Sequence, residues 1–123
     1  MAYLYEKECY KIIGAAQEVH KELGSGFLEV VYQDALEMEL KERQVSAQRE
    51  CSLDIFYKNR KLPRTYYADF VCFAKIIVET KAVKSLTKEH YTQVLHYLKA
   101  TRFRLALLIN FAEPSLKVKR VIL

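Results

Sequence analysis

The chain has few cysteines and no long apolar run among its 123 residues. No apolar segment approaches the roughly 18 residues needed to cross a bilayer, so we expect no membrane-spanning helix. The first residues lack a basic start followed by an apolar run, and we expect no secretory signal. Cys9, Cys51 and Cys72 are odd in number and lack the C-x-x-C spacing of a zinc site, and the three histidines add no ligand spacing. We expect reduced, buried thiols of a cytoplasmic protein.

Glycine and proline are also scarce, with three and two residues respectively. All three glycines fall before position 27, and the turn Gly24-Ser25-Gly26 predicts a place where the backbone bends or lies close to another group. No internal repeat, low-complexity tract or linker interrupts the chain, and 51% of the residues are hydrophobic. This composition favours an ordered globule, and the length suits one core, so we expect residues 1–123 to form a single domain.

The two halves of the chain differ in charge. Residues 1–55 carry 6 Lys and Arg against 11 Asp and Glu, whereas residues 56–123 carry 14 against 4. The second half is therefore strongly basic. This charge suits a polyanionic partner such as a nucleic acid, because neutralised phosphates supply most sequence-independent affinity. A solvated basic surface with no partner would have the same composition.

The spacing of apolar residues predicts three helices and five strands. Apolar residues recur at steps of three and four, as on one face of a helix, over residues 4–23, 27–42 and 88–101. Runs rich in β-branched and aromatic residues predict strands over residues 45–56, 66–73, 76–83 and 105–111, with a last edge strand over 116–122. The order ααβββαβ suits an α/β sandwich with a mixed sheet.

The segment between the first two strands carries a cluster of cations. Around Pro63 lie Lys58, Arg60, Lys61 and Arg64. This composition predicts an exposed basic loop over residues 57–65. We predict that Arg60, Lys61 and Arg64 contact the phosphates of a bound nucleic acid. Lys84, beyond the third strand, is a fourth candidate.

Two charged side chains interrupt the apolar strand that begins at Ile76. Side chains alternate along a strand, so Glu79 and Lys81 share one face, roughly 7 Å apart. Burying a carboxylate and an ammonium costs several kcal/mol per ion unless they are paired or bind a metal. A second acid, Asp69, lies in the preceding strand, and two carboxylates are ligands that suit Mg²⁺. The alternative is a buried ion pair with a structural role.

An Asp followed by Glu-x-Lys on the next strand is the pattern of the PD-(D/E)XK nuclease superfamily. Further motifs lie on either side of this pattern, in the order expected for the superfamily. Residues 26–32 read G-x-x-E-x-x-Y, residues 93–97 read Q-x-x-x-Y, and residues 107–111 resemble the closing strand. From about Ile12 to Val121 the chain thus resembles the GxxExxY proteins, a small bacterial family placed in that superfamily. At Ala106 the family often has glycine, a difference that touches strand packing and leaves the chemistry alone.

The resemblance implies a restriction-endonuclease-like core that hydrolyses phosphodiester bonds in DNA or RNA with Mg²⁺ or Mn²⁺. It implies that Asp69, Glu79 and the backbone carbonyl of Thr80 bind the metal. Lys81 would hold the attacking water or stabilise the phosphate in the transition state. Glu29 would approach from the other side, as a ligand to a second metal or to its water. The helix dipole alone also favours a Glu at that place.

Gln93 and Tyr97 lie four residues apart on one helical stripe, from which they could contact the scissile phosphate or orient Lys81. As a surface pair they would need no function. A catalytically inactive module that binds nucleic acid or a partner is the alternative to a nuclease, and a homodimer or a partner subunit could supply specificity. A shared metal requires Asp69 and Glu79 on one face of the sheet. An antiparallel hairpin meets this requirement only with an odd number of loop residues or a bulge.

Overall fold

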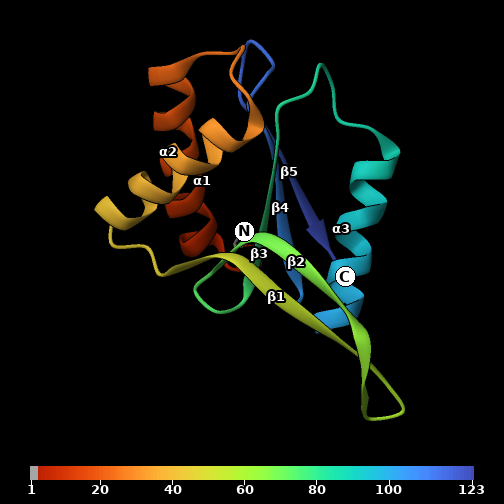
Figure 1. Cartoon of the computed structure of the whole chain (residues 1–123). Coiled ribbons are helices and arrows are strands. Elements are labelled where there is room, and N and C mark those ends of the chain that lie inside the picture. Colours follow the sequence, from red (N-terminus) through yellow and green to blue (C-terminus); the bar gives the residue numbers. More distant parts are fainter. Residues whose placement is uncertain (1–2) are drawn as a thin grey trace.

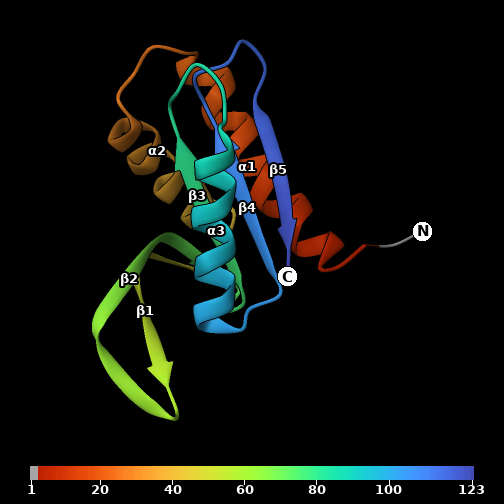
Figure 2. The ribbon, with the colours of Figure 1, turned by 90° about the vertical axis from the view of Figure 1, so that its right-hand side faces the viewer.

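A computed structural model describes residues 3–123 and shows three layers, with a sheet between helices (Figure 1). The elements in chain order are α1 (Glu6–Leu23), α2 (Glu29–Glu42), β1 (Ala47–Tyr57), β2 (Arg60–Cys72), β3 (Ile76–Lys81), α3 (Lys88–Thr101), β4 (Leu105–Asn110) and β5 (Lys117–Ile122). Helices α1 and α2 cover one face of the sheet, and α3 covers the other (Figures 1 and 2). Among residues 3–123, no helix combines the length and the apolar character that a membrane span requires.

The five strands form one mixed sheet in the order β1-β2-β3-β4-β5. β3 and β4 are parallel neighbours connected through α3, and every other neighbouring pair is antiparallel. The predicted α/β fold with a mixed sheet is therefore confirmed. The edge strand predicted over residues 116–122 is confirmed as β5, which pairs with β4. The full order of elements is therefore ααβββαββ, one strand more than the expected order ααβββαβ.

The two central strands are buried on both faces. All of β4 is buried, and so is all of β3 except the half-buried Lys81, as expected for parallel strands covered by helices on either side. One apolar cluster lies under α1 and α2 and includes Phe70 and Val78. The other lies under α3 and includes Ala68 and Ile77. Polar side chains at the end of β3 therefore lie between two apolar layers.

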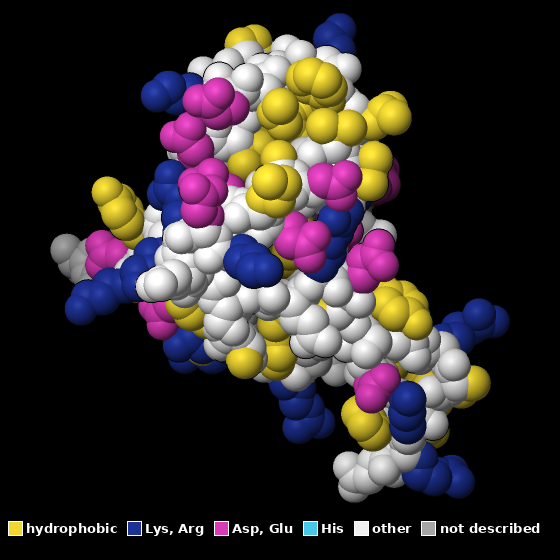
Figure 3. Space-filling view, turned by 60° about the vertical axis from the view of Figure 1, so that its left-hand side comes forward, with side chains coloured by type: hydrophobic (Ala, Val, Ile, Leu, Met, Phe, Trp, Pro, Cys, Tyr) yellow, Lys and Arg dark blue, Asp and Glu magenta, His cyan; other side chains and the backbone are white. Residues whose placement is uncertain are grey.

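The segment 57–65 is exposed and basic as predicted, but it is not a loop, because these residues extend the hairpin of β1 and β2. Its turn is Lys58-Asn59, with both residues in the left-handed region (φ 49° and 63°), and such turns join two twisted strands. Pro63 is tolerated because it lies in the irregular stretch of the ladder where the register shifts. We call residues 54–66 the arm. Figure 3 shows it projecting from the body with Lys and Arg side chains around its end.

The arm leaves the main sheet at a bend beside Asp69. Phe70 belongs to the apolar cluster under α1 and α2, whereas Ala68, two residues earlier, belongs to the cluster under α3. Alternate residues of a regular strand share a face, so the strand must twist sharply between them. On β1, Glu50 has a φ of 49°, and the ladder skips the position that would pair it with Asp69. The bend carries the arm toward α3 (Figure 2).

Candidate active site

Asp69 and Glu79 meet where β2 and β3 stop pairing. The last ladder pair is Phe70–Val78, and the loop between the strands is residues 73–75. This loop has an odd number of residues, as the shared site requires, and the register puts Asp69 at the position opposite Glu79. The alternative register, in which Asp69 would lie on the wrong face, is not observed.

Each of the two carboxylates bonds the backbone of the other strand. The Asp69 N–H donates to Glu79 Oε2 at 2.6 Å, and the Thr80 N–H donates to Asp69 Oδ2 at 2.8 Å. The Thr80 hydroxyl donates to the same Asp69 oxygen at 3.0 Å. These bonds take the place of ladder bonds beyond the last strand pair. They hold the two carboxylates side by side.

Burial makes this pair of carboxylates electrostatically unfavourable without a cation. Glu79 is only 3% exposed. Burial first, and the charge of Asp69 second, raise the Glu79 pKa to about 8, while the Asp69 N–H and the Lys81 charge act in the opposite direction. Without a cation, the fold therefore favours the protonated form of Glu79 more than water does.

Lys81 lies half-buried at the end of β3, within electrostatic reach of two carboxylates. Its charge lowers the pKa of both Glu79 and Glu29. None of the salt bridges found within residues 3–123 involves Lys81, Glu79 or Asp69. A structural ion pair would show such a contact, so the described structure does not support that interpretation of Glu79 and Lys81.

Helix α2 brings Glu29 and Gln33 toward the same end of β3. Burial raises the Glu29 pKa, the charge of Lys81 lowers it, and the charge of Asp69 raises it. Gln33 Nε2 donates to the Thr80 hydroxyl at 2.9 Å and to Glu29 Oε2 at 3.4 Å. Our sequence analysis missed Gln33. Its signal is its place one helical turn after Glu29, on the same face.

Arg49 on β1 fixes this part of α2 to the sheet. Its guanidinium donates to Asp34 at 2.7 Å and to Glu37 at 3.1 Å, and it reaches Gln33 Oε1 at 3.4 Å. Hydrogen bonds therefore link Arg49 through Gln33 to Thr80. This network orients Gln33 between the helix and the carboxylate pair.

Tyr32, the last residue of the G-x-x-E-x-x-Y motif, is fully buried in the apolar cluster under α1 and α2. Its hydroxyl donates to the Gly24 carbonyl at 2.6 Å and accepts from the Phe27 N–H at 3.3 Å. Its ring stacks on Phe111 with 4.9 Å between centroids. Tyr32 therefore fastens the turn that precedes Glu29. This turn needs glycine at position 26, whose φ is 113°.

The predicted pair on α3 divides between the core and the surface. Tyr97 is 9% exposed, and burial first, with the charges of Glu79 and Asp69 next, raises its pKa to about 12. It therefore lies near the carboxylates. Gln93 is exposed and lines an open hollow of about 550 Å³ beside Tyr97. The structure thus brings Tyr97 to the centre and leaves Gln93 at its rim.

The predicted phosphate-binding cations lie on two exposed segments. Arg60, Lys61 and Arg64 are exposed on the arm, beyond the bend at Asp69. Lys84 is exposed in the connection between β3 and α3. Their proposed contacts with nucleic acid remain predictions.

The oxygen donors at the centre suit a hard divalent cation. No group of three or more His, Cys, Asp or Glu side chains in the described part of the chain is placed to hold a metal. Mg²⁺, however, commonly uses one or two carboxylates, with water and phosphate completing the shell. Asp69 and Glu79 provide this pair, and a cation between them would relieve the repulsion that raises the Glu79 pKa. Metal binding by Glu29 and by the Thr80 carbonyl remains a prediction.

Comparison with known proteins gives one match. A sequence model described as the PD-(D/E)XK nuclease superfamily matches residues 6–121, nearly the whole chain. Neither the curated proteins nor the solved structures gave a match.

Proposed function

The chain belongs to the PD-(D/E)XK nuclease superfamily, and from this premise we propose that it is a metal-dependent nuclease that hydrolyses phosphodiester bonds in nucleic acid. One observation supports the proposal most strongly. Asp69 and Glu79, from adjacent strands, are held together where Glu79 is buried and Asp69 half-buried, without a compensating salt bridge among the described residues. Two ionised carboxylates in this place are unfavourable unless a cation occupies the site.

In this proposal Asp69, Glu79 and the Thr80 carbonyl hold Mg²⁺ or Mn²⁺. When bound, the cation would lower the pKa of the attacking water and neutralise charge that develops on the phosphate. Lys81, as an ammonium, holds the attacking water or stabilises the phosphate in the transition state. Tyr97 and Gln93 contact the scissile phosphate from the α3 side and act as catalytic residues.

The motif on α2 supports a finer assignment to the GxxExxY proteins. We propose that its three positions divide the work. Gly26 and Tyr32 shape the turn before α2. Glu29, whose pKa is affected by burial and by the charges of Lys81 and Asp69, binds a second metal or its water. Gln33 holds Glu29 and Thr80 in place.

The proposal extends to partners and location. We take residues 1–123 as one nuclease domain that acts on DNA or RNA in the cytoplasm, where its three free cysteines would stay reduced. A second copy or a partner subunit would supply sequence specificity.

One observation favours a second candidate, a binding module of the same fold without turnover. The pKa of Glu79 is raised, so a metal must compete with a proton for this carboxylate more than at an exposed one. If the metal does not compete successfully, the site keeps its shape and binds nucleic acid without cleaving it.

Calorimetric titration with Mg²⁺ and Mn²⁺, together with a cleavage assay on mixed DNA and RNA, separates the two candidates. A nuclease gives a heat of metal binding and metal-dependent cleavage. Both should be lost in Asp69→Asn and kept in Glu22→Gln, a matched change of one carboxyl to an amide on the exposed side of α1. Absence of both signals in the unmodified protein would leave the binding module as the function.

A further inference from the structure

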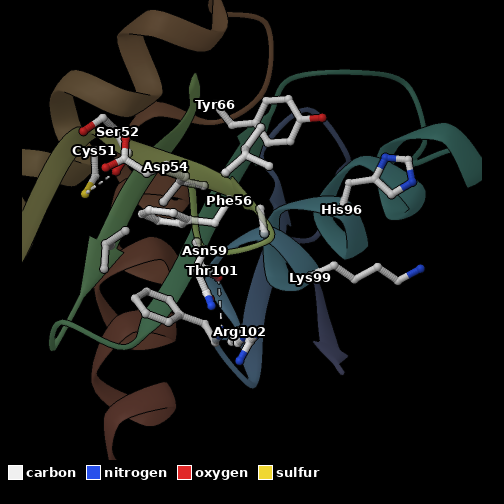
Figure 4. Close-up of a pocket in the computed structure, with 15 residues that line it drawn as sticks. Cys51, Ser52, Asp54, Phe56, Asn59, Tyr66, His96, Lys99, Thr101 and Arg102 are labelled. Atoms are coloured by element: carbon white, nitrogen blue, oxygen red, sulfur yellow. Dashed lines mark hydrogen bonds between the residues drawn. The ribbon is translucent and has the colours of Figure 1, made fainter. Parts of the chain in front are cut away.

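A groove runs along α3 under the arm. Its first part, about 550 Å³, is lined by Tyr66 of the arm and by Gln93, His96 and Tyr97 of α3. Its second part, about 810 Å³, lies between the arm and the C-terminal half of α3, and Tyr66 and His96 line it as well. Figure 4 shows the second part, with side chains of the hairpin on one side and His96 and Lys99 on the other. The two hollows share walls and form one path.

The first hollow lies near the carboxylate centre, because Tyr66 in its wall is only three residues before Asp69 on β2. Tyr97 lines the first hollow, and the charges of Glu79 and Asp69 act on Tyr97. Tyr66 packs on Tyr97 with 5.2 Å between ring centroids, so the arm is anchored to α3 where the two hollows meet. A chain lying in the groove would therefore pass beside Tyr97, the groove residue on which the charges of Glu79 and Asp69 act.

The groove walls combine flat rings with cations. Phe56, Tyr66, His96 and Phe103 supply the rings. Lys99 and Arg102 supply exposed cations at the far end. The acids in the walls are Glu89, which is exposed beside Lys88 in the first hollow, and Asp54 in the second, which pairs with Lys61 at 3.4 Å. Rings on which bases stack, beside cations that follow the backbone, are the usual means of binding single-stranded nucleic acid.

We propose that the groove binds a single-stranded stretch of polynucleotide and leads it to the carboxylate centre, which deepens the proposed function and rests on it. The volumes favour single strands, because each hollow has the size of a small-ligand pocket and accepts unpaired nucleotides rather than a duplex. The exposed arm offers a competing mode, since a two-stranded ribbon can enter the major groove of a duplex.

The experiment measures binding in EDTA, so that cleavage plays no part. Fluorescence anisotropy is recorded with a labelled single-stranded DNA, the same sequence as RNA, and a blunt duplex. We expect the single strands to bind roughly tenfold more tightly than the duplex, with His96→Ala weakening their binding by a similar factor through loss of one stacking ring. The two single strands decide whether DNA, RNA or both are bound.

Lys99→Ala tests the cationic end of the groove. It should lower the slope of log affinity against log salt for single strands by about 0.7. Its matched control is Lys41→Ala, because both lysines are exposed in the last turn of a helix. Equal binding of duplex and single strands, with His96→Ala and Lys99→Ala unchanged, would overturn the inference in favour of the ribbon mode. Groove-dependent binding without metal-dependent cleavage would instead leave this inference standing and remove the nuclease proposal.

Discussion

Strand β2 has two regions with opposite surroundings. Its inner part, Ala68–Cys72, is almost entirely buried and carries Asp69, whereas its outer part, residues 60–67, is almost entirely exposed and carries three cations. The charge of Asp69 in the inner part acts on its neighbour, since after burial it is the next largest cause of the raised Glu79 pKa. Charges in the outer part are screened by water and salt. The comparison teaches that burial, and not the charge itself, decides whether a residue governs chemistry and stability or only association.

The bend beside Asp69 is what separates the two regions. It ends the β2–β3 ladder at Phe70–Val78 and leaves the Thr80 N–H for the Asp69 carboxylate. The same bend turns the arm toward α3, where Tyr66 meets Tyr97. One irregularity thus creates both the carboxylate centre and the groove that approaches it.

The largest effect is expected for cleavage on changing the inner region. Lys81→Ala and Glu79→Gln should each lower the cleavage rate by about 10³-fold or more, because charge stabilisation and metal binding each contribute several kcal/mol. Single-turnover cleavage in Mg²⁺ measures this loss. Arg64→Ala on the outer region is the control and should change the rate at saturating substrate far less. Activity that persists in Glu79→Gln would place the reacting centre elsewhere.

The next effect concerns the stability of the metal-free protein as a function of pH. Because the Glu79 pKa is raised to about 8 in the fold from 4.5, the folded state binds the proton more tightly than the unfolded state. The free energy of unfolding should therefore fall as pH rises from about 4.5 to about 8, by a few kcal/mol, and then level off. Urea unfolding in EDTA at several pH values measures this trend.

Two changes sharpen that result. Glu79→Gln should flatten the decline and match or exceed the stability of the unmodified protein at pH 8, because it removes the buried charge. Saturating Mg²⁺ should flatten the decline as well, since a cation stabilises the ionised form. A steep decline that survives Glu79→Gln would assign the pH dependence to another group.

The inner region could be predicted from sequence, and the arm could not. Strands β3 and β4 are buried on both faces, so their apolar runs predict buried strands from composition alone. Glu79 and Lys81 are recognisable because they are charged residues within such a run. The arm has no apolar run of that kind, and Pro63 with its cations is typical of a loop. Its strand character depends on cross-strand pairing around Lys58-Asn59, which no local pattern reveals.

Within the centre, the same limit applies to polar contacts. Asp69 and Glu79 were found because their residue types and order carry a motif. The bonds from Gln33 to Thr80 and from Arg49 to Gln33 join α2 to two strands. Such contacts depend on how the layers pack, and no spacing in the sequence encodes them.

A smaller effect is expected at the turn that positions α2. Tyr32→Phe removes the hydroxyl that bonds Gly24 and Phe27, and it leaves the Gly24 carbonyl without this partner. The free energy of unfolding should fall by about 1–2 kcal/mol. Tyr10→Phe, on a ring that is 80% exposed, should change it by less than about 0.5 kcal/mol. Equal values for the two variants would show that the buried hydroxyl does not stabilise the turn.

The smallest effect on stability is expected for the outer region, where the change appears only in binding. Replacing Arg60, Lys61 and Arg64 together with Ala removes exposed charges, and the one salt bridge lost, Lys61–Asp54, is exposed and contributes little. The free energy of unfolding should therefore change by less than about 1 kcal/mol. Nucleic-acid affinity should nevertheless fall, and the slope of log affinity against log salt should flatten by about 2, because each phosphate contact contributes roughly 0.7–0.9.

Replacing the three exposed lysines Lys7, Lys11 and Lys21 of α1 is the matched control, with the same loss of charge on the opposite side of the sheet from α3. An equal flattening in the control would mean that the arm contributes only net charge, whereas a selective flattening would make it the part of β2 that contacts phosphates.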